Sequence, residues 1–225
     1  MTKIIAVVSL KGGAGKTSCA IHLAVAAQAS GVSTAIFDLD EQQASAKWSD
    51  ARFAQTKNKQ PVVHSIIHSR LEQEIEKAQG TELIILDTAG FERKVADSAI
   101  KVADLALVPV RPSIQDVQYL STTTDLIKYH QKPLLVVLNH IEPRLPENDE
   151  ARAIIAKLGL PVWSGQLSKA VNYQRPLIGG LRVSEFAVDC KASQEILDLW
   201  EHLRKRLGFA SSKRPGKPKV KRIPR

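Results

Sequence analysis

A glycine-rich loop near the N-terminus constrains this chain more than any other feature. Residues 9–17 read Ser-Leu-Lys-Gly-Gly-Ala-Gly-Lys-Thr, and they directly follow the apolar run of residues 4–8. An apolar strand, a glycine-rich loop and a helix in this order are typical of a phosphate-binding loop, whose backbone N–H groups turn inward around a polyphosphate. The helix expected over residues 16–30 points its positive N-terminus at the same anion.

The residue types of the loop predict how a nucleotide would be bound. Lys16 reaches the β- and γ-phosphates as a point charge, and the hydroxyl of Thr17 binds Mg²⁺. The nucleotide-binding residues that we expect here are Gly12, Gly13, Ala14, Gly15, Lys16, Thr17 and Ser18.

The loop departs from the usual Walker A pattern, G-x-x-x-x-G-K-[ST]. Its first glycine would stand where the chain has Leu10, and a second lysine, Lys11, lies five residues before Lys16. The spacing K-G-G-x-G-K-[ST] resembles the deviant Walker A motif of the ParA/MinD superfamily, most of all the small plasmid-type ParA partition proteins. The resemblance implies an ATP hydrolase in which Lys11 reaches the nucleotide of a second subunit, so that ATP drives the formation of a homodimer.

Short apolar runs alternate with helical patterns along the chain. We expect strands at 3–9, 32–38, 61–67, 82–87, 104–110, 133–139 and 161–163, and helices near 16–30, 42–57, 69–79, 92–103, 113–130 and 146–159. This alternation predicts an α/β fold, namely a P-loop NTPase-like, mostly parallel and twisted sheet with helices on both faces. Ligands of such sheets bind at the carboxyl ends of the strands.

Two carboxylates follow the second expected strand. Asp38 and Asp40 are two residues apart, so both lie on one side of an extended segment that faces the nucleotide. The ParA family has a D-x-D-P-Q sequence here, and its second aspartate positions the attacking water. The resemblance therefore implies that role for Asp40, while Asp38 supports the loop or a metal-bound water. The catalytic residues that follow from this are Lys11, Lys16, Asp38 and Asp40.

Polar residues also end two later apolar runs. Asp87 follows residues 83–86 in a Walker B pattern, and we expect it to bind Mg²⁺ together with Thr17. Asn139 follows residues 134–138, and the family resemblance implies that it bonds the adenine edge. Residues 139–142 read Asn-His-Ile-Glu, a poor match to the guanine motif N-K-x-D, so we expect ATP rather than GTP.

The net charge of +9 is concentrated at the C-terminus. Residues 211–225 hold seven basic residues, three prolines and no acid. This composition excludes a helix, so we expect an ATPase domain at 1–208 and a basic, disordered tail at 209–225. Such a tail contacts phosphates without reading bases, which predicts nonspecific DNA as a partner. We expect basic residues of the body to add to this contact, namely Lys169, Arg175, Arg182, Lys191, Arg204 and Arg206.

Several functions are compatible with these patterns. The resemblance implies a ParA-like ATPase that binds nonspecific DNA as a dimer and drives DNA segregation or cargo positioning, with hydrolysis stimulated by a ParB-like or other adaptor protein. A conjugation-associated relative that acts at transfer-DNA borders and a MinD-like membrane-associated switch are alternatives. A P-loop small-molecule kinase is a further class, against which Lys11 argues.

The last helical pattern bears on the membrane alternative. It carries an apolar face that we expect to pack on the sheet rather than to enter a bilayer, formed by Ile196, Leu199, Trp200, Leu203 and Leu207. The tail that follows offers little apolar surface, so we expect no membrane anchor. Because the chain starts at once with a strand and shows no leader pattern, we expect a cytoplasmic, nucleoid-associated protein.

Overall fold

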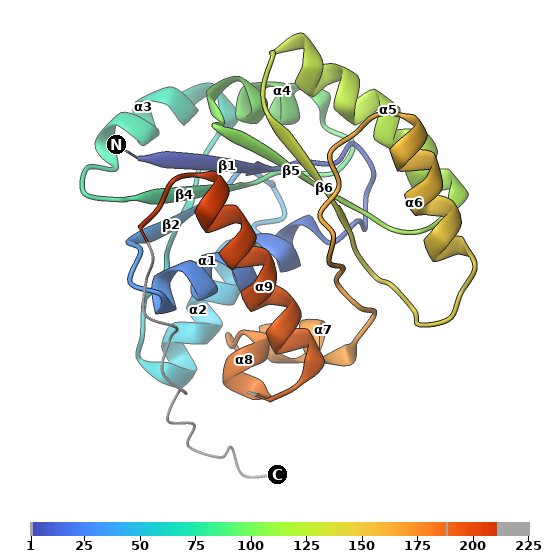
Figure 1. The fold of residues 1–225 in the computed structure, drawn as a ribbon. Helices are drawn as coiled ribbons and strands as arrows, with labels where there is room; N and C mark the ends of the chain where they lie inside the picture. The colour runs from blue at the N-terminus through green and yellow to red at the C-terminus, as the bar shows by residue number, and fades with distance from the viewer. Residues whose placement is uncertain (1, 188, 211–225) are drawn as a thin grey trace.

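A computed structural model describes residues 2–187 and 189–210 of the chain. Within them, one sheet has the strand order β3-β2-β4-β1-β5-β6, and every pairing is parallel (Figure 1). The strands are β1 (Lys3–Val7), β2 (Thr34–Asp38), β3 (Val62–Ser65), β4 (Leu83–Asp87), β5 (Leu105–Val110) and β6 (Leu134–Leu138). Because the strands are parallel, their carboxyl ends meet at one edge of the sheet.

Helices connect the strands and extend beyond the last one. They are α1 (Lys16–Ala29), α2 (Ala44–Thr56), α3 (Leu71–Lys77), α4 (Arg93–Val102), α5 (Ile114–Tyr129), α6 (Glu147–Lys157), α7 (Val171–Ile178), α8 (Val183–Phe186) and α9 (Lys191–Arg206). A short 3₁₀ turn, His68–Arg70, precedes α3.

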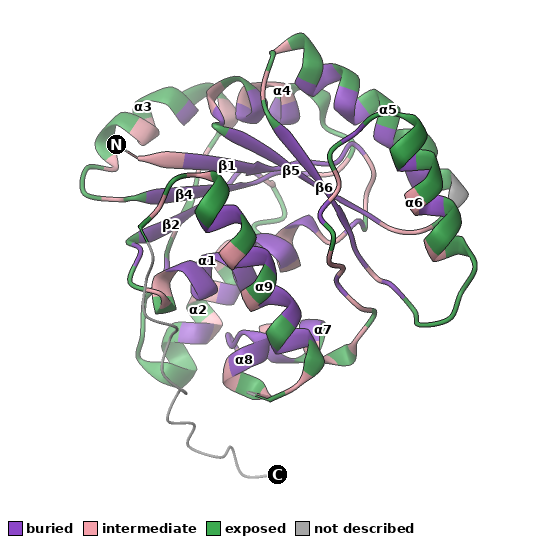
Figure 2. Ribbon diagram, in the orientation of Figure 1, coloured by how far each residue is buried: buried purple, intermediate pink, exposed green. Residues whose placement is uncertain are grey.

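Alternate residues of each central strand build two separate cores. Ile4 and Ala6 of β1 pack with α3, α4, α5 and α6, whereas Ile5 and Val7 pack with α1, α2, α7, α8 and α9. The two groups of helices lie above and below the sheet in the view of Figure 1, and Figure 2 shows the central strands buried between them. Burial on both faces explains why these strands are continuous apolar runs in the sequence.

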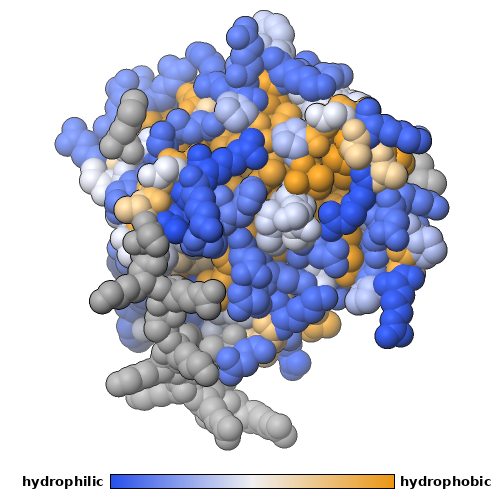
Figure 3. Space-filling view, in the orientation of Figure 1, coloured by the Kyte–Doolittle hydropathy of each residue, from blue (hydrophilic) through white to orange (hydrophobic). Residues whose placement is uncertain are grey.

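The outer surface in the view of Figure 3 is mostly polar, in contrast to the two apolar cores. Figure 3 shows a largely hydrophilic face, with hydrophobic side chains gathered near β5 and β6. Of the strands, β3 lies at the edge of the sheet and is mostly exposed. No helix among the described residues is long and apolar enough to cross a membrane.

The predicted α/β fold is confirmed, and the six strands and the helices up to α6 end within two residues of the predicted positions. The strand predicted at 161–163 is wrong. Val162 makes only an isolated bridge to Val136, because the chain bends away at residues 164–165 before it pairs again through Ser168 and Ile141. Helices α7 and α8 were not predicted, since Pro176 lies inside α7 and disfavours a helix in sequence-based reasoning.

The packing of the last helix also differs in detail from the prediction. Its apolar residues Ile196, Leu199, Trp200 and Leu203 are buried, as expected, whereas Leu207 is only partly buried. They lie in one core with α1, and Nε1 of Trp200 donates a hydrogen bond of 3.0 Å to the hydroxyl of Ser30 at the end of α1. The helix therefore packs on α1, and at its end Nη2 of Arg206 donates a hydrogen bond of 3.0 Å to the carbonyl oxygen of Leu134 in β6.

Candidate nucleotide site

The glycine-rich loop lies between β1 and α1, at the carboxyl edge of the sheet. Gly15 precedes α1 with φ of +90°, in the left-handed region that favours glycine. A Cβ atom at this position would collide with the side-chain amide of Asn139, so the loop approaches the end of β6 as closely as a glycine allows. The side of the loop away from Asn139 is open.

That open side is a cavity of about 320 Å³. It is lined by Gly12, Gly13, Gly15, Lys16, Thr17, Ser18, Asp40, Gln42, Thr88, Gly90 and Phe91. Most of the predicted nucleotide-binding residues therefore share one cavity. Ala14 is buried beside it. Backbone N–H groups at the start of a helix, glycines that admit close approach and one lysine fit a polyphosphate.

Lys16 is the cation within this cavity. Its side chain is buried, and Nζ donates a hydrogen bond of 3.3 Å to the carbonyl oxygen of Lys11. Burial lowers the pKa of Lys16, while the charges of Asp87 and Asp40 act in the opposite direction. A bound phosphate would add negative charge to this site and favour the charged lysine.

Asp87 and Thr17 meet below the loop. The hydroxyl of Thr17 donates to Oδ1 of Asp87 at 3.2 Å, and the hydroxyl of Ser45 donates to Oδ2 at 2.7 Å. Burial raises the pKa of Asp87 to about 7, and the nearby Asp38 adds to the effect, although both hydroxyl hydrogen bonds oppose it. A divalent cation would favour the ionised carboxylate.

These two side chains fit the oxygen ligands that Mg²⁺ prefers. Among the residues that the structure describes, no three His, Cys, Asp or Glu side chains form a group that could hold a metal ion. Thr17 and Asp87 would thus hold Mg²⁺ together with phosphate oxygens and water, which is how Mg²⁺ is commonly bound at nucleotide sites.

The two carboxylates at the carboxyl end of β2 have different surroundings. Asp38 is buried, and its two oxygens each accept a backbone hydrogen bond of 3.1 Å, from the N–H groups of Asp40 and Ala46. Asp40 lines the phosphate cavity, and its Oδ1 accepts a hydrogen bond of 2.9 Å from the backbone N–H of Gln42. Asp38 therefore holds the segment between β2 and α2, and Asp40 faces the cavity.

Lys11 does not line the phosphate cavity. Its Nζ lies 3.8 Å from Oδ1 of Asp116 and 5.0 Å from the ring centroid of Tyr119, and both residues belong to α5. Asp116 also caps this helix with Ser113, whose hydroxyl accepts from its backbone N–H. Lys11 is thus directed away from the loop that contains it.

Asn139 connects β6 to the glycine-rich loop. It is buried, and Nδ2 donates to the carbonyl oxygen of Ala14 at 2.7 Å while Oδ1 accepts from the backbone N–H of His140 at 2.9 Å. It also lines a second cavity of about 770 Å³ that continues from the loop and reaches Tyr173 and Leu167. This cavity could hold a base. The contact between Asn139 and adenine stays a prediction.

Three residues at the site were missed in the sequence. Ser45 donates a hydrogen bond to Asp87, and nothing in the sequence around Ser45 indicates this role. His140 and Arg111 border the glycine-rich loop. Arg111 could have been found, because it directly follows β5 and the same rule that identified Asp38 and Asn139 applies to it.

Two of the basic residues predicted to contact DNA cannot do so in this structure. Arg182 and Arg204 are each 4% exposed. Arg204 is bound to Glu201 and to the carbonyl oxygen of Phe209, so its charge is already paired. The predicted tail falls almost entirely on residues 211–225, which lie outside the described part of the chain.

Comparison with known proteins places this site in context. Residues 5–180 match the family model described as the CobQ/CobB/MinD/ParA nucleotide binding domain. The chain is 27% identical over 186 residues to the maintenance of carboxysome distribution protein A of Halothiobacillus neapolitanus, covering 80% of this chain and 85% of that protein. It is 26% identical over 134 residues to protein ParA of Rhizobium radiobacter, covering 58% and 59% of the two chains.

Solved structures share the fold. The septum site-determining protein MinD of Pyrococcus horikoshii, complexed with Mg-ADP, superposes with a TM-score of 0.74 at 17% identity, covering 92% of this chain and 98% of that one.

Proposed function

The chain belongs to the CobQ/CobB/MinD/ParA nucleotide-binding family and is an ATP hydrolase that works with Mg²⁺, and from this premise we propose that it acts as a ParA-like positioning ATPase. In this proposal ATP joins two subunits, the dimer binds DNA without sequence preference, and an adaptor protein stimulates hydrolysis to release it. The nucleoid would then serve as the surface on which the protein moves DNA or another cargo.

The position of Lys11 is the observation that carries the dimer. Its ammonium group points to α5 and leaves Lys16 alone in the phosphate cavity. One ion pair at 3.8 Å and one cation–π contact hold it there. Such contacts stabilise a partly exposed lysine by only about 0.5–1 kcal/mol each. Lys11 can therefore leave this position at little cost and reach the phosphates of a second subunit.

Hydrolysis in this proposal is carried by residues of the phosphate cavity. Asp40 orients a water molecule, the water oxygen attacks the γ-phosphorus, and the bond to the β–γ bridging oxygen breaks to release ADP and phosphate. Lys16 stabilises the negative charge of the transferring group, since phosphoryl transfer depends mainly on positioning and charge stabilisation. Mg²⁺, held by Thr17 and Asp87, would supply further neutralisation of the phosphate oxygens.

The relatives support two candidate cargoes. The match to the carboxysome distribution protein spans more of the chain than the match to protein ParA. This coverage supports positioning of a protein assembly as a candidate beside plasmid partition. In both cases the partner would be a ParB-like or other adaptor that recognises the ATP-bound dimer.

Sedimentation with ATP tests the dimer. We expect Asp40→Ala to bind ATP without hydrolysing it and to accumulate as a dimer. Adding Lys11→Ala to this variant should return it to a monomer while ATP binding persists. Arg70→Ala, an exposed residue on the 3₁₀ turn, is the matched control. A double variant that still dimerises with ATP would remove the basis of the proposal.

DNA binding tests the second half. Exposed cations of the body that remain as candidates are Lys169, Arg175, Lys191 and Arg206. We expect the protein to bind unrelated DNA duplexes with ATP but not with ADP. The logarithm of the binding constant should fall with the logarithm of the salt concentration, with a slope of about −0.9 per phosphate neutralised. Removing residues 211–225 should flatten this dependence for all sequences alike. Tight binding without nucleotide would contradict the switch, and an unchanged salt dependence would show that the tail is not a DNA contact.

A further inference from the structure

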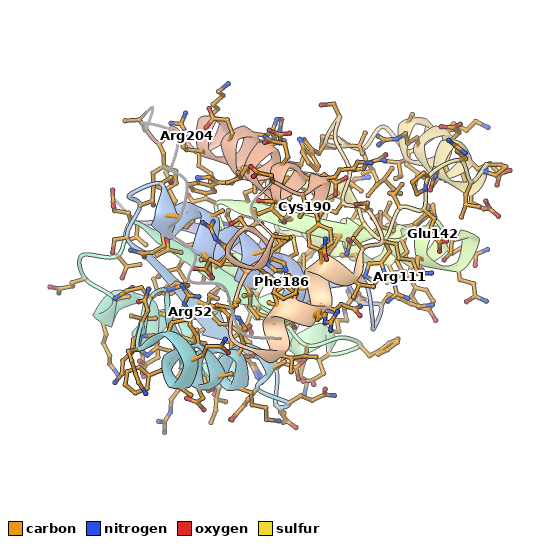
Figure 4. The ribbon with its side chains drawn as sticks, turned by 90° about the horizontal axis from the view of Figure 1, so that it is seen from below. Arg52, Arg111, Glu142, Phe186, Cys190 and Arg204 are labelled. Carbon is orange, nitrogen blue, oxygen red and sulfur yellow. The ribbon has the colours of Figure 1, made fainter. Side chains whose placement is uncertain are left out.

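A third basic side chain borders the glycine-rich loop and has no assigned role. Arg111 directly follows β5, at the carboxyl edge of the sheet, and Pro112 after it keeps its backbone out of the helical region. Its Nη2 lies 3.1 Å from the position that a Cβ atom of Gly13 would occupy. Figure 4 shows Arg111 on the same side of the molecule as Glu142, away from Arg52. The guanidinium therefore rests against the loop itself.

The charges around the loop are unevenly paired. Lys16 interacts with Asp87 and Asp40, and Lys11 interacts with Asp116. Arg111 forms no hydrogen bond or ion pair with any residue that the structure describes, and its Nε is buried without a partner. Leaving such a donor unsatisfied costs about 1–3 kcal/mol, more when the group is charged. Of these three cations, Arg111 is the one that still needs an anion.

Neighbouring side chains do not provide that anion. Asp116 is engaged elsewhere: Oδ1 faces Lys11, and Oδ2 accepts a hydrogen bond of 2.6 Å from the hydroxyl of Ser113. Glu142 lines the cavity of about 770 Å³ together with Arg111, and it accepts a hydrogen bond of 2.5 Å from Nζ of Lys169.

His140 adds no charge to the same corner of the site. Burial lowers its pKa, and the charge of Arg111 lowers it further, so the imidazole is neutral at pH 7. The net charge that the protein presents between Gly13 and Asn139 is therefore the positive charge of Arg111.

We propose that Arg111 is a phosphate-binding residue of the nucleotide site, which contacts the polyphosphate of the nucleotide bound to its own loop from the side opposite Lys16. A guanidinium suits this task because its planar set of donors can bind two phosphate oxygens at once. Arg111 lines the cavity of about 770 Å³ and Lys16 lines the phosphate cavity, so the two side chains would approach a nucleotide that spans both cavities from different sides of the loop. This inference depends on nucleotide binding and not on dimerisation or DNA.

Binding of tripolyphosphate and adenosine separates a phosphate contact from a base contact. Arg111→Gln should weaken binding of ATP and of tripolyphosphate about ten- to a hundredfold, the loss of one charge-assisted hydrogen-bonding group, and leave adenosine binding unchanged. Arg111→Lys keeps the charge but loses the planar donors, so its affinity for ATP and tripolyphosphate should lie between those of the wild type and Arg111→Gln. Arg70→Gln removes one positive charge from an exposed position and is the matched control.

The thermal stability of the ligand-free protein provides a second readout. If the guanidinium lacks an anion, Arg111→Gln should melt at the same temperature as the wild type or higher. Wild-type and Arg111→Gln proteins with equal Kd for ATP and for tripolyphosphate would overturn the proposal. An equal loss of adenosine binding, or a lower melting temperature of the ligand-free variant, would overturn it as well, since Arg111 would then act on the base pocket or on folding.

Discussion

Asp87→Asn should stabilise the ligand-free protein while it impairs the function. In the wild type the Asp87 carboxylate is buried beside Asp38, and these surroundings raise its pKa to about 7 from an ordinary value of 3.8. The folded chain therefore holds one proton more than the unfolded chain between these two values. The free energy of unfolding then falls as the pH rises through this window, and it stays lower above it.

The size of the effect follows from the shift. Each pKa unit corresponds to about 1.36 kcal/mol. Between pH 5 and pH 8 the free energy of unfolding of the wild type therefore falls by up to about 3 kcal/mol, whereas that of Asp87→Asn does not change through this group, because asparagine is uncharged. For a chain of this length, 1 kcal/mol moves the melting temperature by about 2–4 °C. Asparagine can still hydrogen-bond the hydroxyls of Thr17 and Ser45, which now donate to Asp87 at 3.2 and 2.7 Å.

Thermal unfolding in EDTA, without nucleotide, measures this difference. The gap in melting temperature between Asp87→Asn and the wild type should widen by about 6–10 °C from pH 5 to pH 8. Asp50→Asn, an exposed position on α2, should show no such widening. With ATP, Mg²⁺ should stabilise the wild type but not Asp87→Asn. A gap of equal size at both pH values would refute the reasoning, because the penalty could not then come from the charge of Asp87.

Two further substitutions test the loop and the packing of α8. Gly15→Ala should lose about 1–2 kcal/mol of stability because its backbone is left-handed, and it should also lose ATP binding because the new methyl group displaces Asn139. Gly31→Ala is the control, since it has the same backbone strain and nothing lies within 4 Å of its new methyl group. Equal ATP binding by the two variants in a titration would contradict the argument. Glu185→Ala should cost about 3 kcal/mol in urea unfolding, because it leaves the buried Arg52 without the carboxylate that binds it at 2.8 Å. Glu74→Ala, which breaks the exposed pair with Lys77, should cost less than about 1 kcal/mol, and a similar loss in both would show that burial is not the cause.

The amino-acid sequence alone determined the fold class and predicted most of the residues that line the candidate site. The apolar strands and the helices up to α6 were predictable because hydrophobic period and glycine position are properties of short segments. The glycine-rich loop predicted a phosphate cavity, and the rule that ligands bind at the carboxyl ends of parallel strands predicted that Asp40, Asp87 and Asn139 lie near the loop. These features need no knowledge of which strands are neighbours.

Only the tertiary structure decided which side chains meet across that edge. The order of the strands places Ser45 on Asp87 and Asn139 on Ala14, residues that are 42 and 125 positions apart. The tertiary structure also buries Arg182 and Arg204, although nothing in the sequence distinguishes them from exposed basic residues. The contact of Lys11 with Asp116 on α5 and the position of Arg111 beside Gly13 depend on how other elements pack against the loop. Pairing of distant side chains is a consequence of packing, and no local pattern encodes it.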